Sequence, residues 1–364
     1  MRIIQLITRP QRRGAEIFAS QLAQKLIEKG HEVWVVSVYR GEAKLPFTGK
    51  METLDARTSW RGVDPKAWKR LDALIRDFQP DILQANASET LKYAAISKKL
   101  LGWNTPLVYR NANKISGFLD GKAKLFFNRW LMTEVKAVIS VSEATLSDFS
   151  SIFRVKHQVS IPIGIDTAVI SKSLSLTTSR IIEGEYLVFI GGLVPEKDPF
   201  GMLEIFERIN KNFPELHLVY VGSGPLEQAL STAINQKGLG EKVRMLANQE
   251  NIFPLLSGAK ALVMPSKIEG LPAVILEAMY CRIPVIAYEV GGIGEVLQRK
   301  ETGWAVPAGD RLAFEAAVLD CLNLPAIELE KITESAKERV EERYELNEVV
   351  AAFEGYYKEL IVGG

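Results

Sequence analysis

The sequence predicts an α/β protein with two Rossmann-like domains, each built around a doubly wound parallel sheet. Short apolar runs alternate with helical patterns along most of the chain, which is typical of parallel sheets with helices on both faces. The runs form two series separated by a polar stretch, so two sheets are expected. The length of 364 residues also exceeds what a single hydrophobic core usually supports.

The first series contains five expected strands. A helix follows the first of them, because Ala15, Phe18, Leu22 and Leu26 recur at helical spacing and Gly30 can end the helix. The expected strands cover residues 2–7, 32–38, 81–85, 106–109 and 137–141.

The second series also contains five expected strands. They cover residues 186–190, 217–221, 243–246, 261–264 and 284–287. Between the two series, residues 171–179 are small and polar without clear periodicity, as in a linker. After Asp310 the pattern is helical, including residues 325–344 and 345–360. We therefore expect an N-terminal domain at 1–166, a linker at 167–184 and a second domain at 185–344.

The composition excludes several classes of protein. A net charge of +1, from 45 basic and 44 acidic residues, gives no overall attraction to nucleic acid. The two cysteines, Cys281 and Cys321, form no Cys-x-x-Cys pair, which argues against a disulfide framework or a zinc site. The first strand begins at Arg2 with no signal peptide before it, and no apolar run reaches the roughly 18 residues of a membrane span. We expect a cytoplasmic protein.

Two carboxylates eight residues apart, Glu269 and Glu277, flank a predicted junction of strand, loop and helix. The strand at 261–264 precedes them, and Pro272 is favoured at the start of a helix. The free amides and the dipole at such a helix start favour an anion. A phosphate can therefore lie on these amides while the two carboxylates hold hydroxyl groups on either side. The alternative is an ordinary solvated Glu269 and an exposed Glu277.

Four glycine turns follow other expected strands. Glycine lets the backbone approach a phosphate closely, and the following helix start favours negative charge. The second turn also carries Lys197, which can neutralise a phosphate, although each turn can equally be plain structure. The turns contain Arg13-Gly14, Gly191-Gly192, Gly222-Ser223-Gly224 and Gly291-Gly292.

Taken in order along nearly the whole chain, these motifs resemble those of retaining glycosyltransferases of the GT-B fold, family 4, also called glycosyl transferases group 1. The resemblance implies that the two domains face a cleft, with the nucleotide mainly on the second domain and the acceptor on the first. It implies that the helix at 345–364 returns to the N-terminal domain. It also implies a hexosyltransferase that retains the configuration of the sugar.

The resemblance assigns roles to individual residues. Glu269 and Lys197 are the expected catalytic residues, and they contact the donor sugar and the diphosphate. Glu277 is expected to hold the ribose hydroxyls. The donor-binding set is Arg13, Gly14, Gly192, Gly222, Gly270, Leu271, Pro272, Ala273, Val274 and Glu277. The expected contacts to the acceptor or the donor sugar are Asn86, Arg110, Asn111 and Asn113.

The chain departs from the family pattern at three places. Arg13 stands where relatives often have the first glycine of Gly-Gly-x-Glu. Gly192 stands where an arginine usually neutralises the diphosphate, and we hypothesise that Arg12, Arg13 or Arg110 supplies the missing charge. Relatives often carry a histidine at a strand end of the first domain, where this chain has asparagine amides.

The expected partners are small molecules and glycans. No Asp-x-Asp pair occurs, which indicates a metal-independent site without a cofactor. The donor substrate is a nucleotide-diphosphate sugar, with UDP favoured as the commonest carrier and GDP as the alternative. The acceptor is expected to be a glycan or lipid-linked molecule of cell-surface polysaccharide, lipopolysaccharide or glycolipid synthesis.

Basic and aromatic residues interleave over residues 122–132. A helix of this composition can lie on a membrane surface and receive a lipid-linked acceptor. It can also be a core face whose basic ends reach solvent.

Two other functions fit the same fold. A sugar-nucleotide epimerase or hydrolase would convert the donor without an acceptor. A non-catalytic subunit would bind a sugar nucleotide or a partner enzyme, and Gly192 and the missing histidine favour it. A dehydrogenase is disfavoured, because the third glycine of Gly-x-Gly-x-x-Gly is missing after Gly224.

Overall fold

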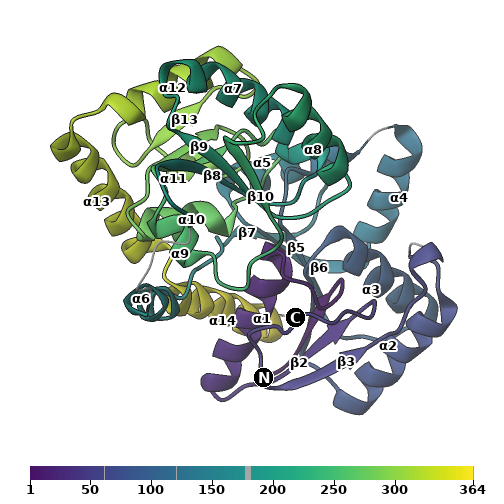
Figure 1. The fold of residues 1–364 in the computed structure, drawn as a ribbon. Helices are drawn as coiled ribbons and strands as arrows, with labels where there is room; N and C mark the ends of the chain where they lie inside the picture. Colours follow the sequence, from purple (N-terminus) through teal and green to yellow (C-terminus); the bar gives the residue numbers. More distant parts are fainter. Residues whose placement is uncertain (61, 120, 177–181, 364) are drawn as a thin grey trace. The chain divides into compact units, whose positions relative to one another are not determined.

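The chain folds into two compact units, each with its own parallel sheet (Figure 1). The computed structural model describes residues 1–60, 62–119, 121–176 and 182–363. Unit 1 consists of Met1–Gly164 and Leu346–Gly364, and unit 2 of Ile165–Glu345. Two parallel-sheet Rossmann-like domains were the predicted fold class, and this prediction is confirmed.

Unit 1 has a sheet of order β3-β2-β1-β4-β5-β6-β7. The order changes direction between β1 and β4, and in open α/β sheets ligands bind at the carboxyl ends of strands at such a switch point. The strands are β1 Arg2–Ile7, β2 Glu32–Ser37, β3 Lys50–Thr53, β4 Ile82–Ala85, β5 Leu107–Asn111, β6 Val135–Ser140 and β7 His157–Ser160.

The helices of unit 1 include α2, which shows how local sequence fixes an element. Asp64 caps its start by accepting from the amides of Lys66 and Ala67, and Pro65 occupies the first turn. The helices are α1 Gly14–Glu28, α2 Pro65–Phe78, α3 Ser88–Leu101, α4 Lys122–Met132, α5 Glu143–Ile152 and α14 Leu346–Val362, with short 3₁₀ turns η1 Thr58–Trp60 and η2 Ile115–Phe118.

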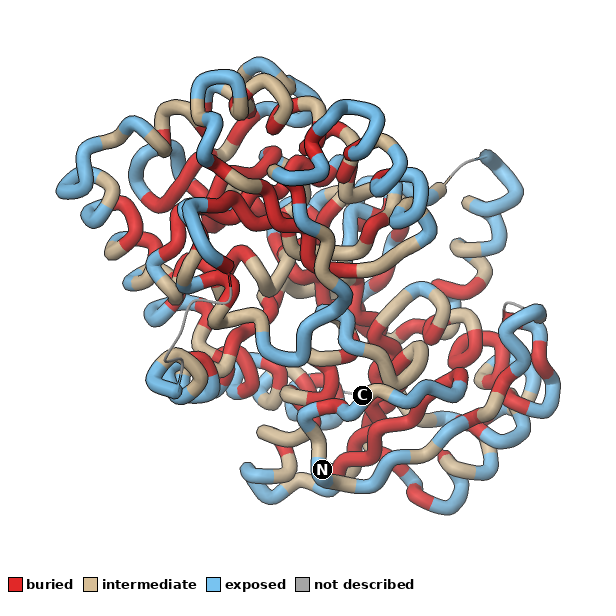
Figure 2. The backbone as a smooth tube through the Cα atoms, viewed as in Figure 1, coloured by how far each residue is buried: buried red, intermediate tan, exposed pale blue. Residues whose placement is uncertain are grey.

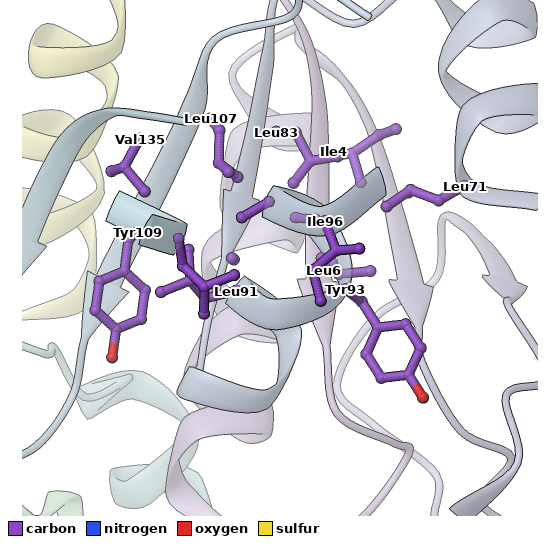
Figure 3. Packing of buried hydrophobic residues seen from close by; sticks show 14 of the residues in the cluster. Ile4, Leu6, Leu71, Leu83, Leu91, Tyr93, Ile96, Leu107, Tyr109 and Val135 are labelled. Atoms are coloured by element: carbon purple, nitrogen blue, oxygen red, sulfur yellow. The ribbon is translucent and has the colours of Figure 1, made fainter. Parts of the chain in front are cut away.

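The two faces of the unit 1 sheet differ. One face is apolar: side chains of alternate strand positions pack against those of α2 and α3 (Figure 3). The labelled residues of this core include Ile4, Leu6, Leu71, Leu83, Leu91, Ile96, Leu107 and Tyr109. The opposite face is covered by α1 and α14, which touch through Phe18 and Phe353 with ring centroids 5.7 Å apart. It carries a row of polar side chains.

Unit 2 has a sheet of order β10-β9-β8-β11-β12-β13, which changes direction between β8 and β11. Its strands are buried throughout the centre of the sheet (Figure 2). They are β8 Tyr186–Ile190, β9 His217–Val221, β10 Val243–Leu246, β11 Ala261–Met264, β12 Val285–Tyr288 and β13 Trp304–Val306. The helices are α6 Thr167–Ser175, α7 Pro199–Asn212, α8 Glu227–Gln236, α9 Phe253–Ser257, α10 Ala273–Tyr280, α11 Ile293–Val296, α12 Arg311–Asn323 and α13 Ala326–Arg343, with a 3₁₀ turn η3 Pro195–Lys197.

The first half of the expected linker at 167–184 contains helix α6 of unit 2. Asp166 caps this helix by accepting from the amide of Val169 at 3.0 Å, and Ile170 is its buried residue. Capping and burial outweigh the low helix propensity of the serines. Residues 177–181 of the predicted linker lie outside the described residues.

Three short strands, β3, β7 and β13, were not expected from the sequence. The first two lie at the edges of the unit 1 sheet and are only partly buried, so they lack a continuous apolar run. The third has three residues. Within the described ranges, no helix combines the length and the apolar character needed to cross a membrane.

Candidate functional site

Four loops of unit 2 meet at the carboxyl ends of β8, β9, β11 and β12. Lys197 lies on the loop after β8 and Glu269 on the loop after β11, the two strands that flank the switch point. Backbone hydrogen bonds join the loops: Leu193 N to Ser223 O at 3.0 Å, Leu226 N to Leu193 O at 3.1 Å, Lys267 N to Glu196 O at 2.7 Å and Gly292 N to Gly270 O at 2.5 Å. The loops therefore form one connected layer above the sheet.

Two glycines are required for the loops to pack. A Cβ atom at Gly222, whose φ is +149°, would lie 2.0 Å from the carbonyl oxygen of Gly191. A Cβ atom at Gly291, whose φ is +58°, would lie 2.2 Å from the carbonyl oxygen of Glu269. Only glycine allows these approaches of backbone to backbone. Gly291 therefore supports the loop that carries Glu269.

Gly192 has no such constraint. The nearest atoms to a Cβ placed there lie 3.8 Å away, which is ordinary contact. A larger residue therefore fits at this position without strain at the Cβ.

The two predicted catalytic residues are in contact. Glu269 is 5% exposed, and its Oε1 accepts from Nζ of Lys197 in an ion pair. The side chain of Lys197 is 23% exposed, and a Cβ at Gly191 would lie 3.9 Å from its aliphatic carbons. The lysine compensates the charge of a carboxylate that would otherwise be costly to bury.

A second lysine of this layer was missed by the sequence analysis. Lys267, two residues before Glu269, places its Nζ 3.2 Å from Oδ1 of Asp198. Asp198 also caps α7 by accepting from the amide of Gly201 at 3.3 Å, and it adopts a left-handed φ of +47°. The signal was available in the sequence as a cation next to the Glu269 loop, but its partner Asp198 is distant along the chain.

Glu277 lies on α10, half-buried, with its side chain free of hydrogen bonds and ion pairs to any described residue. Burial raises the pKa of its carboxyl group to about 7. The helix begins after Pro272 without a side-chain cap, so the amides of its first turn, at Ala273 and Val274, have no partner within the helix. Gly270 and Leu271, just before it, are buried.

The donor-binding candidates of unit 1 lie at the start of α1. Arg13 is the cap residue, its side chain makes no capping bond, and both Arg13 and Gly14 are exposed. A Cβ at Gly14 would meet nothing within 4 Å, so glycine is not sterically required there. Arg12 donates from Nη1 to the carbonyl oxygen of Lys44 at 3.3 Å.

The asparagines of unit 1 differ in exposure. Asn86 is 2% exposed, and its amide is bonded to Gln5 and Gln84 at 2.9 Å each. Asn111 is also buried, with Nδ2 3.4 Å from Oγ of Ser140. Of the three candidate asparagines, Asn113 alone is exposed. The strand-end amides expected to be free for a ligand are thus mainly bonded to protein.

Arg110 is a buried cation. Its guanidinium lies 4.4 Å from the ring centroid of Phe18, and its Nε and Nη1 have no hydrogen-bond partner in the part of the chain that the structure describes. Burial lowers its pKa to about 10. Glu16, buried nearby on α1, has its pKa raised by desolvation. A buried guanidinium with unpaired donors is unusual and is typical of a functional position.

Histidine, cysteine and carboxylate side chains form no cluster of three or more suited to a metal ion in the described part of the chain.

Comparison with known proteins identifies the family. The model of "Glycosyltransferase Family 4" matches residues 12–169, and that of "Glycosyl transferases group 1" matches residues 179–339. An α-1,4-N-acetyl-D-galactosaminyltransferase of Campylobacter jejuni is 28% identical over 314 residues, which is 83% of each chain.

Solved structures share the fold. The structure of Anabaena Alr3699/HepE with UDP and glucose aligns with a TM-score of 0.82 at 19% identity, over 99% of this chain and 100% of that one. Sucrose-phosphate synthase of Thermosynechococcus elongatus aligns with a TM-score of 0.82 at 18% identity, over 100% of both chains. The chain belongs to the glycosyltransferases of group 1 and family 4, nucleotide-sugar-dependent enzymes of the GT-B fold.

Proposed function

We propose that the protein transfers a hexose from a UDP-sugar to a glycan or lipid-linked acceptor, with retention of configuration. The observation that carries the proposal is the Lys197–Glu269 ion pair in the same loop layer as the uncapped start of α10 and the unpartnered Glu277. This set offers a cation and free amides for a diphosphate, and carboxylates for hydroxyl groups on both sides of it.

The ion pair suggests how the donor is engaged. Without ligand, Lys197 neutralises Glu269. A bound diphosphate, with its greater charge, draws the ammonium group toward itself and accepts hydrogen bonds from the amides of Leu271, Ala273 and Val274. Glu269 is then free to accept from a sugar hydroxyl and to stabilise positive charge that develops at the anomeric carbon. Glu277 holds the ribose hydroxyls.

Retention follows if the acceptor attacks from the face that the diphosphate leaves. The leaving phosphate oxygen takes the proton of the acceptor hydroxyl, so no side chain forms a bond to the sugar. Arg110 and Asn113 are proposed to contact substrate on unit 1. Asn86 and Asn111, whose amides are bonded within the protein, are proposed to support them.

The relatives support a UDP-sugar and a lipid-linked acceptor. The Anabaena structure contains UDP and glucose. The Campylobacter enzyme is named for a substrate that ends in PP-undecaprenol. By analogy, we place this chain in the synthesis of cell-surface polysaccharide or glycolipid.

The test uses the purified protein with UDP- and GDP-sugars, each with and without lipid-linked and free glycan acceptors. We expect a UDP-sugar to give a glycosylated acceptor with the donor's anomeric configuration, read by mass spectrometry and NMR. Turnover without acceptor would identify an epimerase or hydrolase. Nucleotide binding without any turnover would identify a non-catalytic subunit, the alternative that Gly192 favours.

We also propose that α4 lies on an anionic membrane surface. Phe126 is 74% exposed and Phe127 is 38% exposed, so these two rings do not belong to the core face that was the alternative interpretation. Leu125, Trp130, Leu131 and Met132 are the residues of the helix that pack into unit 1. Exposed Lys122, Lys124 and Arg129 provide the charge that attracts acidic lipids.

Vesicle sedimentation tests this proposal. The protein should bind vesicles that contain about 30 mol% acidic phospholipid. It should not bind vesicles of neutral lipid. A variant with Phe126→Ser and Phe127→Ser should lose binding while keeping its transfer rate on a soluble acceptor. Unchanged binding, or dimers that dissociate in this variant, would contradict a membrane role.

A further inference from the structure

The polar row on the α1 and α14 face of unit 1 is closed by a residue of the last helix. Gln5 and Gln84 are paired across β1 and β4, and both are fully buried. Tyr357, on α14, is also fully buried, and its hydroxyl donates to Oε1 of Gln84 at 2.6 Å. The same hydroxyl accepts from Nε2 of Gln5 at 3.2 Å.

These bonds fix the orientation of two further amide groups. Because Oε1 of Gln84 faces the tyrosine, its Nε2 faces the other way and donates to Oε1 of Gln5 at 3.0 Å and to Oδ1 of Asn86 at 2.9 Å. Asn86 in turn donates to Oε1 of Gln5 at 2.9 Å. Removing the Tyr357 hydroxyl removes the donor that holds Gln84 in this orientation. It leaves Oε1 of Gln84 as a buried acceptor without this bond.

We infer that Tyr357 is a positioning residue for the substrate side of unit 1. Through Gln84 it sets the orientation of Asn86 at the carboxyl end of β4, beside the switch point of the sheet. Arg110, at the end of the neighbouring β5, shares this face: the charge of the Tyr357 oxygen and that of Arg110 influence one another's pKa. The inference rests on the proposed function, since Arg110 is there assigned to substrate.

The neighbouring tyrosine provides a matched control. Tyr356 lies on the same helix, and its hydroxyl is buried without a hydrogen-bond partner among the described residues. Tyr356→Phe and Tyr357→Phe each remove one buried hydroxyl and keep the ring. Only the second variant breaks the polar row.

The experiment measures transfer kinetics, UDP binding and thermal unfolding for both variants. Tyr357→Phe should lower kcat/KM for transfer about ten-fold, as expected if the misplaced side chains cost the transition state about one ordinary hydrogen bond, with a dissociation constant for UDP within about two-fold of wild type. Tyr356→Phe should change neither quantity. Tyr357→Phe kinetics equal to those of Tyr356→Phe would overturn the inference and leave the proposed function intact, whereas a wild-type protein without transfer would overturn the function itself.

A double variant separates positioning from general destabilisation. If Tyr357 acts through Asn86, adding Tyr357→Phe to Asn86→Ala should cost less than about two-fold more in kcat/KM, because contacting residues of one network are not additive. Losses that multiply would overturn the inference. So would recovery of full Tyr357→Phe activity at a lower temperature, where both variants are fully folded.

Discussion

The candidate residues of unit 2 lie in loops and on a helix that follow its strands, whereas Asn86, Arg110 and Asn111 of unit 1 are buried in and beside its sheet. Lys197, Glu269 and the start of α10 lie on the segments that follow strands β8 and β11, and Glu277 has no hydrogen-bond or ion-pair partner among the described residues. Asn86 and Arg110 are buried beneath α1 and α14. Unit 2 thus offers groups that are free to bind a ligand. Unit 1 offers groups held by a network of side chains, and this network must form before they can bind one.

The most damaging single change is expected at the turn that supports the Glu269 loop. Gly291→Ala should lower the free energy of unfolding by about 2–5 kcal/mol and abolish transfer, since the Cβ meets the Glu269 carbonyl and the φ is left-handed. Gly309→Ala is the control: its φ is +80° but its Cβ would meet nothing within 4 Å, so it should cost only about 1–2 kcal/mol. Urea unfolding measures both, and equal losses would show that the backbone contact does not matter.

A large effect on binding is expected at Glu277. Glu277→Gln should weaken UDP binding about 10- to 100-fold, because a hydrogen bond to a charged acceptor is lost. It should also make the unliganded protein more stable at neutral pH, since the desolvated carboxylate is removed. Calorimetric titration and thermal unfolding give the two quantities. Glu241→Gln, at an exposed position of the same unit, should change neither.

The carboxyl group of Glu277 should also make stability and donor affinity depend on pH. A carboxyl group with its pKa raised to about 7 keeps its proton in the folded protein where the unfolded chain has lost it. Stability should therefore decrease as pH rises from about 4.5 to about 7. Affinity for an intact UDP-sugar, which needs the ionised form, should rise about ten-fold from pH 6 to pH 8. A flat profile, or one that persists in Glu277→Gln, would assign the titration elsewhere.

The smallest effect is expected at Gly192. The position has room for a larger residue, so Gly192→Arg should restore the family cation and tighten UDP binding about 2- to 10-fold, while Gly192→Ala leaves it unchanged. Fluorescence competition with UDP measures the difference. No gain from the arginine would indicate that another cation, such as Lys267 of the adjoining loop, already serves the diphosphate.

The parts of the molecule that the sequence predicted share a local cause. The glycine and proline turns at Gly222, Gly291 and Pro272 can be recognised from a few neighbouring residues. The buried strands can be recognised from their continuous apolar runs. The row of Gln5, Gln84 and Tyr357 was not predicted, because its pairing joins positions 79 and 352 residues apart. One glutamine within each of two apolar strands, Gln5 in β1 and Gln84 in β4, was the local sign of it.

Helix α6 and the exposed face of α4 were also not predictable from the local sequence alone. Small polar residues suggested a linker, yet one cap and one buried isoleucine were enough for a helix. The interleaved aromatic residues of α4 had two interpretations, a membrane-surface helix and a core face. Only burial shows which side chains face solvent, as Phe126 does, and which are buried, as Leu131 is.

The return of the chain to unit 1 at Leu346 has a consequence for biosynthesis. The ribosome makes the first 164 residues of unit 1, then all of unit 2, and only then the helix that covers the remaining sheet face. Until Phe353 and Tyr357 emerge, Gln5 and Gln84 stand open to water on an incomplete domain. Synthesis must therefore pass through all of unit 2 and reach α14 before unit 1 can mature, and a product that stops before α14 would be a natural target for quality control.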